Sequence, residues 1–515
     1  MRFTEDIHIE VTYVKYLQDL LRVTETVRVE GPADREVTDV TADSRDVKAG
    51  SLFFCLCGAH VDGHAFAASA AEKGAAVIVA EKAVAVPEGT TVVYVKDTRK
   101  AMEDMTPFFF DYPARRMRML AVTGTNGKTT TTHICAHILQ QAGYKTGVIG
   151  TIHMLIGDRE YPTHNTTPDV VDLEKMLYQM AQEGVTHVCM EVSSHALVMG
   201  RVEGVEFDNA SFTNLTEDHL DYHKTMDNYA AAKALLFAKV SEAGQTKSGK
   251  SAHINADAPY ADVMENAVSD RALCPVTSFS IDRPSDLQAS HIRFNANSSE
   301  FTVRWKGTDY EVYTHLVGRF NVYNVLTAMS ACLGEGVSME VILDALKTFR
   351  AVPGRFELID EGQPFTVVVD YAHTPDGLEN ILKTAEELRR NRIIAVFGCG
   401  GDRDRMKRPI MGRIGASYAD IVIVTSDNPR TEDPDAIVAE VAAGVKEIAG
   451  EKEGFHYEIL VNRRDAIRRA IALAEPGDIV MIAGKGHENY QILKDRTIHF
   501  DDREEARAAL KELGD

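Results

Sequence analysis

The first hundred residues show short apolar runs separated by glycine-containing turns. Two runs have the length and composition of strands, Ser51 to Leu56 and Ala75 to Val79, and the alanine-rich stretch Ala65 to Lys73 is typical of a helix. This pattern predicts a small N-terminal α/β domain at residues 1–115. A segment rich in proline and arginine, 112–116, precedes the next apolar run and is interpreted as a linker.

A longer alternation of strand-like and helical segments follows this linker. The strand-like runs 119–123, 147–151 and 186–191 are separated by helical patterns, which indicates parallel strands joined by crossover helices. We expect this central domain, 116–351, to be the largest. Its polar segment 243–252 contains Gly, Ser and Lys without an apolar period, and it is interpreted as a surface loop.

Strands and helices alternate again after a turn at Val352-Pro353-Gly354, which marks the second predicted boundary. The C-terminal domain, 352–515, is predicted to be doubly wound and Rossmann-like, because each apolar run of strand length is followed by a helical pattern. In such sheets ligands bind at the carboxyl ends of the strands. The predicted strands are 365–369, 393–397, 421–425 and 479–483.

Length and charge restrict the class of protein. At 515 residues the chain exceeds the size of one hydrophobic core, which stops growing near roughly 250 to 300 residues. The hydrophobic fraction of 44% and the charged fraction of 26% are those of globular proteins. The net charge of -21 repels phosphate backbones and anionic lipids, so we expect no nucleic acid partner and no membrane partner.

The cysteines and the apolar runs indicate a cytoplasmic protein. The seven cysteines are scattered and include no C-x-x-C pair, which is unlike a disulfide framework or a zinc ribbon and favours a reducing compartment. No stretch approaches about 18 consecutive apolar residues, and the N-terminus does not resemble a signal peptide. We therefore expect a protein that is neither exported nor inserted into a membrane, and we take it to be a monomer.

The strongest chemical signal is an apolar strand followed by a glycine-containing turn and a helix that should end near Gly143. It predicts a phosphate loop and ATP binding, because the glycines let backbone N–H groups approach phosphate oxygens, Lys128 can neutralise the terminal phosphates, and a threonine can bind Mg²⁺. The loop reads G-x-x-G-K-T, with Val122 in place of the first glycine of the usual pattern. The central domain is thus expected to be P-loop ATPase-like. The loop residues are Gly124, Thr125, Asn126, Gly127, Lys128, Thr129 and Thr130.

A phosphate loop alone leaves the reaction open, since kinases, GTPases, motors and ligases all carry one. Further motifs narrow the choice. They are Asp43-Ser-Arg45, Asn165-Thr-Thr-Pro168, Glu191-Val-Ser-Ser-His-Ala-Leu197, Thr213-Asn-Leu-Thr-Glu-Asp-His-Leu-Asp-Tyr-His223, Tyr229-Ala-Ala-Ala-Lys233, Gly318-Arg-Phe-Asn-Val-Tyr-Asn324, Pro353-Gly-Arg-Phe-Glu357, Asp370-Tyr-Ala-His-Thr-Pro375, Gly401-Asp-Arg-Asp404, Asp427-Asn-Pro-Arg430 and Gly484-Lys-Gly-His-Glu488. Together they resemble the Mur ligases, which build the peptide of bacterial peptidoglycan. The resemblance covers nearly the whole chain.

The resemblance implies an ATP-dependent ligase that adds meso-diaminopimelate to UDP-N-acetylmuramoyl-L-alanyl-D-glutamate. In this family ATP phosphorylates the substrate carboxylate, and an amine then attacks the acyl phosphate to form an amide. Phosphorylation supplies a leaving group, while Mg²⁺ and Lys128 stabilise charge on the transferred phosphoryl group. The enzyme therefore acts mainly by positioning and neutralising.

The resemblance also implies the residues that hold Mg²⁺. Thr130 and Glu191 would serve the ion on the ATP phosphates, and His219 would help to hold a second ion. The spacing His219-x-Asp221-x-His223 is also compatible with zinc, but no third nitrogen or thiolate donor is evident nearby, so we favour Mg²⁺.

Lys233 lies in an alanine-rich helical stretch, and this context alone predicts a solvated lysine. The family carries a carbamylated lysine at the matching position, where the modification turns a cation into an anion that can bind Mg²⁺. The resemblance thus makes Lys128, Glu191, His219 and Lys233 the expected catalytic residues.

The remaining nucleotide and sugar contacts also come from the resemblance. For ATP it points to Asn321, Arg355 and Asp370, each of which could instead be a turn or helix-cap residue. For the UDP-sugar it points to loop hydroxyls and one arginine, which suit an anionic substrate, although Ser and Thr are also common turn residues. The sugar-substrate residues are Ser44, Asn165, Thr166, Thr167, Ser193 and Arg201.

Electrostatics give an argument about the amine that does not depend on the resemblance. Diaminopimelate differs from lysine by one distal carboxylate, so its pocket needs a guanidinium as well as an acid for the distal ammonium. Arg430, Arg403 and Glu488 supply this set. A guanidinium without a carboxylate partner would be costly. The resemblance adds that lysine-adding relatives do not share the arginine that ends Asp427-Asn428-Pro429-Arg430. Gly484 is expected at the same pocket. The alternative interpretation of Asp427-Asn428-Pro429 is a turn that ends a strand and leaves Arg430 exposed.

Two other functions remain open. One is another Mur ligase step or a ligase similar to folylpolyglutamate synthetase, against which Arg430 and Arg403 argue. The other is a P-loop switch or kinase, which would turn over ATP without an amine acceptor. In the ligase the phosphate loop and the amine pocket are predicted on different domains, so these domains must close for the reaction.

Overall fold

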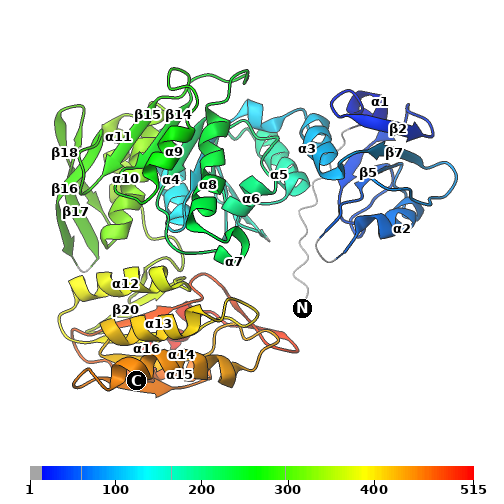
Figure 1. Ribbon diagram of the computed structural model, residues 1–515. Coiled ribbons are helices and arrows are strands. Elements are labelled where there is room, and N and C mark those ends of the chain that lie inside the picture. The colour runs from blue at the N-terminus through cyan, green and yellow to red at the C-terminus, as the bar shows by residue number, and fades with distance from the viewer. Residues whose placement is uncertain (1–13, 59–60, 164, 296, 515) are drawn as a thin grey trace.

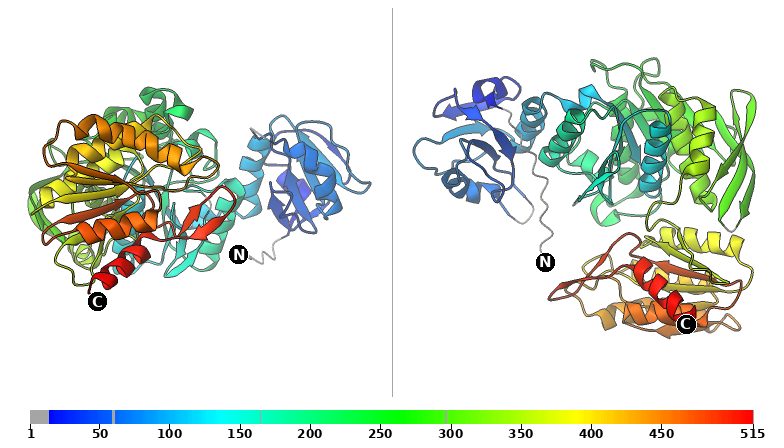
Figure 2. Two further views of the ribbon diagram at one scale, coloured as in Figure 1. Left: turned by 90° about the horizontal axis from the view of Figure 1, so that it is seen from below. Right: turned by 180° about the vertical axis from the view of Figure 1, so that it is seen from behind.

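The protein consists of three α/β parts that follow one another along the chain (Figure 1). The structure is a computed structural model, and it describes residues 14–58, 61–163, 165–295 and 297–514. The N-terminal part stands at one end of the central part, and the C-terminal part packs against another side of it (Figure 2). The expected α/β class is confirmed. Among the described residues no helix has the length and apolar character needed to span a membrane.

The described residues of the N-terminal part form a five-stranded sheet whose first strand in space runs antiparallel to its neighbour, while the other four strands are parallel. In spatial order the strands are β2 (Thr26–Glu30), β7 (Thr91–Val95), β6 (Val77–Ala80), β5 (Ser51–Phe54) and β4 (Asp39–Thr41). The helices are α1 (Leu17–Leu20), the 3₁₀ turn η1 (Gly63–Phe66), α2 (Ala67–Glu72) and α3 (Thr98–Phe109), and a short pair joins β1 (Lys15–Tyr16) to β3 (Glu36–Val37).

The central part has a large sheet whose middle strands are parallel and whose two edges are antiparallel. In spatial order its described strands are β11 (Arg159–Tyr161), β10 (Met154–Ile156), β9 (Thr146–Ile149), β12 (His187–Glu191), β8 (Arg118–Thr123), β13 (Asn209–Phe212), β14 (Ser251–Asn255), β15 (Val276–Ser280), β16 (Leu287–Asn295), β17 (Ser298–Trp305) and β18 (Thr308–Thr314). The helices are η2 (Pro113–Arg116), α4 (Lys128–Gln141), α5 (Val170–Gln182), α6 (Ser194–Val198), α7 (Leu220–His223), α8 (Met226–Val240), α9 (Ala261–Ala267), α10 (Arg319–Gly334) and α11 (Met339–Thr348).

The C-terminal part is doubly wound, as the sequence predicts. Its spatial strand order is β19 (Glu357–Ile359), β20 (Thr366–Asp370), β24 (Ile479–Ala483), β21 (Ile393–Phe397), β22 (Ile421–Val424) and β23 (His456–Ile459). One apolar core lies under α12 (Pro375–Leu388), α13 (Lys407–Tyr418) and α14 (Pro434–Ala449), and a second lies under α15 (Arg463–Leu473) and α16 (Asp502–Gly514). A hairpin of β25 (Tyr490–Ile492) and β26 (Thr497–His499) completes it. Cores on both faces explain why the parallel strands are continuous apolar runs.

The polar segment 243–252 is a loop up to Lys250, as its composition predicts, but two of its lysines point inward. Its last residues form the start of β14. Lys250 is 3% exposed and donates to the Phe207 carbonyl at 2.7 Å, while Lys247 pairs with the buried carboxylate of Asp208. The long apolar stems of the two lysines carry their ammonium groups under the loop. An ion pair of this kind leaves no apolar period in the sequence, so the sequence predicted the loop but not the inward direction of these lysines.

One buried carboxyl group lies where α5 meets α3. Glu174 is 1% exposed, and its Oε2 atom has no hydrogen-bond partner among the described residues. Both Pro107 and Glu174 border Gly204, where a Cβ atom would lie 2.2 Å and 2.9 Å from them. Burial raises the pKa of Glu174 to about 8. The native protein therefore keeps a proton that the unfolded chain loses, so the free energy of unfolding should fall as the pH rises from 4.5 to 8.

We expect Glu174→Gln to raise the free energy of unfolding by about 2 kcal/mol near pH 8, because the amide keeps the volume and carries no charge. The variant and the natural protein should have the same stability below pH 4.5, where the carboxyl group is protonated in both states. Urea unfolding followed by circular dichroism at the two pH values measures this difference. The same pH dependence in both proteins would show that another group titrates.

Candidate active site

The predicted phosphate loop connects β8 to α4. Gly124 and Gly127 have φ angles of 148° and 86°, and Cβ atoms there would lie 1.9 Å from Thr213 Oγ1 and 2.2 Å from Asn324 Oδ1. Only glycine fits either position. Lys128 begins α4, and its Nζ atom donates to two carbonyls of the loop at 2.9 and 2.8 Å. Burial lowers the pKa of Lys128. The loop therefore places a cation and a helix N-terminus together, as phosphate binding requires.

Glu191 lies next to this loop because β12 runs parallel beside β8, with Glu191 opposite Val122. The residue is 1% exposed, and its two carboxylate oxygens accept hydrogen bonds from the Thr151 amide at 2.9 Å and the Thr151 hydroxyl at 3.0 Å. Thr130 is buried in the first turn of α4. Two oxygen ligands of the kind that Mg²⁺ prefers thus border the loop.

Lys233 is not the solvated lysine that its sequence context predicts. It is 1% exposed, and its Nζ atom donates to the Gly124 carbonyl at 2.9 Å and lies 4.5 Å from the centre of the Tyr229 ring. Within the described part of the chain it forms no ion pair, and burial together with Lys128 holds its pKa well below the ordinary value. The alanines around Lys233 let α8 pack closely on the sheet, and this packing buries the lysine.

His219 belongs to a cluster of aromatic rings near Lys233. Its backbone is left-handed, with a φ angle of 55°, and its ring centre lies 4.9 Å from that of His195 and 6.1 Å from that of Tyr229. His223 stacks on Tyr229 at 5.0 Å and contacts His195 at 5.2 Å. The cluster brings His219 and Lys233 into one region of the site. His195 is a member of it that the sequence analysis did not single out.

The positions of the side chains do not support a zinc site at His219, Asp221 and His223. One group of three close metal-ligand side chains occurs among the described residues, Cys57, Asp62 and His64, and it does not include His219. His64 Nε2 accepts a hydrogen bond from the Glu81 amide at 3.0 Å, so Nδ1, which lies 2.6 Å from Asp62, carries the hydrogen. A protonated Nδ1 has no lone pair for a metal, and the group is therefore a hydrogen-bonded cluster.

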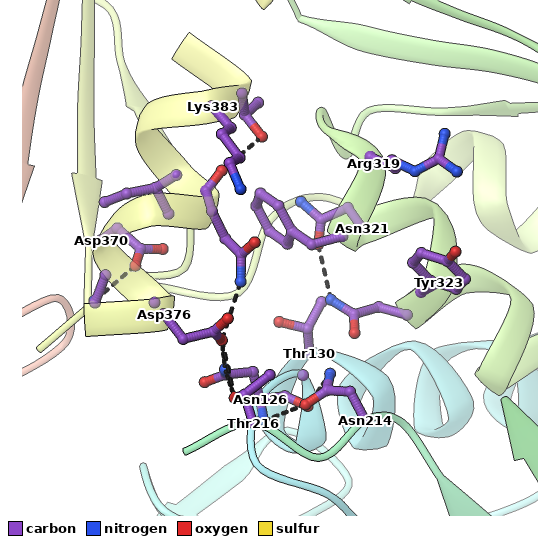
Figure 3. A pocket seen from close by; sticks show the side chains of 18 of the residues that line it. Asn126, Thr130, Asn214, Thr216, Arg319, Asn321, Tyr323, Asp370, Asp376 and Lys383 are labelled. Carbon is purple, nitrogen blue, oxygen red and sulfur yellow. Dashed lines mark hydrogen bonds between the residues drawn. The ribbon is translucent and has the colours of Figure 1, made fainter. Parts of the chain in front are cut away.

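A cavity of about 450 Å³ lies between the central and C-terminal parts (Figure 3). It borders the phosphate loop at Asn126, α10 at Asn321 and the first turn of α12 at Asp376. Asp376 Oδ2 accepts hydrogen bonds from Asn126 at 2.6 Å and from Thr216 at 3.0 Å, so the loop is bonded directly to the C-terminal part. The Asn321 side-chain oxygen accepts from Asn324 at 3.0 Å. The size and place of the cavity suit a nucleoside next to its phosphates.

Arg355 reaches the phosphate loop from the other side of this cavity. Its Nη2 atom donates to Thr129 Oγ1 at 3.1 Å, and its guanidinium lies 4.4 Å from the centre of the Tyr371 ring. Asp370, at the end of β20, accepts from two backbone amides, that of Phe356 among them, at 2.6 and 2.7 Å. Burial raises the pKa of Asp370, and Arg355 opposes this shift. Asp370 therefore holds the turn that carries Arg355.

Four of the predicted sugar-substrate residues gather at the end of β12. The Thr167 hydroxyl donates to the Glu191 carbonyl at 2.9 Å and accepts from the Ser193 amide at 3.0 Å. Arg201 donates to the Thr167 carbonyl at 3.1 Å, and its buried Nε atom has no hydrogen-bond partner in the described residues. The Thr166 hydroxyl lies 3.0 Å from the threonine hydroxyl that holds Glu191. An anionic group bound here would lie beside the phosphate loop.

Ser44 and Asn165 lie outside this group. Ser44 follows β4 in the N-terminal part, and its carbonyl accepts a hydrogen bond from Lys73 at 2.6 Å. Asn165 is exposed in the turn before Thr166. The described contacts join neither residue to Thr167, so their assignment to the sugar substrate stays a prediction.

The residues predicted for the amine come together because β24, β21 and β22 are neighbouring parallel strands whose carboxyl ends meet at one edge. Asn428 Nδ2 donates to Glu488 at 2.8 Å. A Cβ atom on Gly400 would lie 3.0 Å from Arg430 Nη1 and 3.9 Å from the Arg403 side chain, so both arginines flank one turn. The full set is Arg403, Asp427, Asn428, Pro429, Arg430, Gly484 and Glu488.

Two buried cations at this pocket were not predicted. The Lys485 side chain is fully buried, and its Nζ atom lies 2.9 Å from Glu488 and 3.6 Å from Asp427. The Arg463 side chain is also fully buried and pairs with Asp502 at 2.6 Å. Lys485 belongs to the motif Gly484-Lys-Gly-His-Glu488, so the sequence contained a signal from which it could have been predicted. Arg463 lies in α15 among several other charged residues, so the sequence did not distinguish it.

The fold and the site define the class: a three-part α/β protein in which a phosphate loop on the central sheet is bonded to residues at the strand ends of the C-terminal sheet. Family models match the chain in the same order. The match is to the Mur ligase family catalytic domain at 36–109, the Mur ligase middle domain at 122–332 and the Mur ligase glutamate ligase domain at 354–486. The chain belongs to the Mur ligase family, whose members are ATP-dependent.

Several relatives share one name, UDP-N-acetylmuramoyl-L-alanyl-D-glutamate–2,6-diaminopimelate ligase. That of Geobacillus kaustophilus strain HTA426 is 48% identical over 479 residues, which are 93% of this chain and 96% of the relative. That of Syntrophomonas wolfei is 46% identical over 482 residues, 94% of this chain and 96% of the relative. A solved structure of a ligase of this name has a TM-score of 0.69 and 33% identity, and it covers 98% of this chain and 100% of its own. The MurF ligase of Thermotoga maritima in complex with ADP, at 15% identity and a TM-score of 0.62, has the same fold over 92% of this chain and 97% of its own.

Proposed function

We propose that this chain joins meso-diaminopimelate to UDP-N-acetylmuramoyl-L-alanyl-D-glutamate in peptidoglycan precursor synthesis, at the expense of ATP. The main support for the proposal is that one segment contacts both the phosphate loop and the residues predicted for the amine. Arg355 touches the phosphate loop, and the turn before it packs on the motif of Glu488, since a Cβ atom on Gly354 would lie 2.1 Å from the His487 amide nitrogen. A carboxylate activated at the loop therefore has the amine pocket beside it.

The chemistry has two steps. An oxygen of the substrate carboxylate attacks the terminal phosphorus of ATP, which forms an acyl phosphate and releases ADP. The amine nitrogen then attacks the acyl carbon, forms the C–N bond and releases phosphate and a proton. Lys128 would neutralise charge on the phosphoryl group in the first step, and the oriented N–H groups at the start of α4 would bind its oxygens.

Thr130 and Glu191 would hold Mg²⁺ on the ATP phosphates. The fit rests on their chemistry and their burial: both offer oxygen, both border the loop, and Thr151 fixes both oxygens of the Glu191 carboxylate. The ion would supply positive charge that offsets the negative charge of the phosphates.

We further propose that Lys233 is carbamylated and, with His219, faces a second Mg²⁺. As a buried amine beside Lys128 that forms no ion pair with any described residue, Lys233 is poorly placed to carry a positive charge. Its nitrogen lone pair can add to CO₂, and loss of one proton leaves an anion. The anion would balance Lys128 and suit a divalent cation.

For the amine, Arg430 and Arg403 would bind the distal carboxylate and Glu488 the distal ammonium. Lys485 is paired with Glu488, so this half-buried acid is already partly neutralised and retains its second oxygen for the substrate. Diaminopimelate carries one more carboxylate than lysine, and it alone of the two would satisfy both guanidinium groups.

For the sugar substrate, we propose that UDP binds near Ser44 and that the peptide carboxylate reaches Thr166, Thr167, Ser193 and Arg201. The unpaired Nε atom of Arg201 is a donor that an anionic substrate would satisfy. Asn165, which precedes Thr166 and is exposed, would contact the same substrate. We also propose a monomer in the cytoplasm, in line with seven unpaired cysteines.

Phosphate release tests the proposal. The purified protein is supplied with ATP, Mg²⁺ and UDP-N-acetylmuramoyl-L-alanyl-D-glutamate, and with meso-diaminopimelate, L-lysine or no amine. We expect release with diaminopimelate only, and a product whose mass corresponds to the amide. Equal release with lysine would refute the role of Arg430, and release without any amine would favour a switch or a kinase.

A further inference from the structure

The two loops that carry Arg403 and Arg430 are bonded to each other. Arg430 Nη1 donates to the Gly401 carbonyl at 2.9 Å, and the Gly401 amide donates to the Asn428 carbonyl at 2.9 Å. Asp402 accepts from both the hydroxyl and the amide of Thr431, at 2.7 and 3.2 Å. The loop after β21 and the loop after β22 therefore form one unit at the mouth of the amine pocket.

Glu432 lies at the centre of this unit. Its Oε1 atom accepts from the Asp402 amide at 2.6 Å and from Arg408 at 2.8 Å, and its Oε2 atom accepts from Arg408 at 3.0 Å. The Arg408 side chain is fully buried, and it also donates to the Gly400 carbonyl at 3.3 Å and to Glu440 on α14 at 2.8 Å. The pair of Glu432 and Arg408 thus fastens both loops to α13 and α14.

The backbone shows why such fastening is needed. Asp402 and Arg430 have φ angles of 53° and 52°, in the left-handed region that residues with a Cβ atom rarely adopt. Such conformations persist only where the surrounding contacts over-determine them. The Arg430 amide donates to the Ile492 carbonyl at 3.1 Å, which fixes the loop on its other side. The direction of the Arg430 guanidinium therefore depends on contacts of the loop backbone as well as on the hydrogen bond that its own side chain makes to Gly401.

We propose that Glu432, held by Arg408, is a positioning residue that aims the two arginine-bearing loops at the second carboxylate of the amine substrate. It acts on the affinity and selectivity for the amine and leaves the phosphoryl transfer and the amide-forming step unchanged. Both Glu432 carboxylate oxygens are occupied by Arg408, so the acid does not repel an anionic substrate group nearby. The proposal rests on the proposed ligase function, which supplies the substrate with a second carboxylate.

The test is a steady-state comparison of Glu432→Gln with the unmodified enzyme. We expect the KM for meso-diaminopimelate to rise about 10- to 30-fold, with kcat and the KM values for ATP and the UDP-sugar unchanged within about threefold, because one charge-assisted network is lost. The preference for diaminopimelate over lysine should fall by a similar factor. Glu432→Asp keeps the charge and should recover part of the loss.

Glu440→Gln is the matched control, because Glu440 also pairs with Arg408 but contacts the loop after β21 only through the exposed side chain of Arg405 and makes no hydrogen bond to the backbone of that loop. It should leave the KM for diaminopimelate within about twofold, as expected for a partly exposed ion pair. Tryptic cleavage after Arg430 gives a second readout that needs no activity, and it should become faster in Glu432→Gln only.

Equal effects of Glu432→Gln and Glu440→Gln, or a fall in kcat with an unchanged KM, would overturn the proposal. Cleavage after Arg430 that is no faster in Glu432→Gln than in the unmodified enzyme would do the same. Absence of diaminopimelate-dependent phosphate release in the unmodified enzyme would instead reject the ligase function, and the proteolysis would still decide whether Glu432 orders the loops.

Discussion

Lys233→Ala is expected to lower kcat at least about 1000-fold, which is about 4 kcal/mol in the activation barrier. The side chain is fully buried, and its nitrogen lies 2.9 Å from the first carbonyl of the phosphate loop. Removing it deletes the group that we propose to carry the carbamate, so the charge of Lys128 and of a bound cation is no longer balanced. Phosphate release under saturating substrates measures the loss.

Lys239→Ala on the same helix is the control. Lys239 pairs with Glu203 at 3.2 Å and lies outside the site, so this variant should keep kcat within about twofold. A carbamate signal in nuclear magnetic resonance spectra recorded with isotope-labelled bicarbonate should be present in the unmodified enzyme and in Lys239→Ala, and missing in Lys233→Ala. Near-normal activity of Lys233→Ala would show that this lysine only fills space.

Arg430→Met is expected to lower kcat/KM for meso-diaminopimelate about 100- to 1000-fold, because a guanidinium that meets a carboxylate in a partly buried pocket contributes roughly 2 to 5 kcal/mol. Methionine keeps much of the stem volume without the charge. The value for L-lysine should change far less, since lysine has no distal carboxylate to lose a partner. The ratio of the two kcat/KM values therefore measures the selectivity that Arg430 provides.

Arg405→Met gives the comparison for this variant. Arg405 lies in the neighbouring loop, is exposed and pairs with Glu440 on α14. Its removal should leave both kcat/KM values within about twofold. If Arg430→Met lowers kcat/KM for L-lysine as much as kcat/KM for diaminopimelate, Arg430 supports the loop and does not bind the second carboxylate.

Much of the fold follows from the sequence because parallel strands with helices on both faces are continuous apolar runs. The runs 393–397 and 479–483 are strands with the predicted bounds. The short strand β19 was not predicted, since three residues next to a turn carry little periodic signal. The phosphate loop also follows from local chemistry, because its glycines, lysine and helix start are adjacent in the chain.

Grouping the residues of the proposed amine pocket required one further inference from the sequence. Its residues come from three separate motifs, and the rule that ligands bind at the carboxyl ends of parallel strands was sufficient to group them. The rule does not predict which charged side chains near those motifs are buried and paired. Lys485, Arg463 and Arg408 are buried only because of the way neighbouring loops and helices pack.

By itself the sequence determined the class of fold, the phosphate loop and the motifs that gather at the strand ends, since each depends on residues close together in the chain. Only the tertiary structure decided the environment of single charged side chains. It buried Lys233 on the packed face of its own alanine-rich helix, turned Lys250 inward, and bonded Asp376 to Asn126 across two parts of the chain. The burial and the charge pairing of a side chain depend on neighbours that are distant in sequence. These neighbours set the protonation and the chemistry of a lysine or an acid.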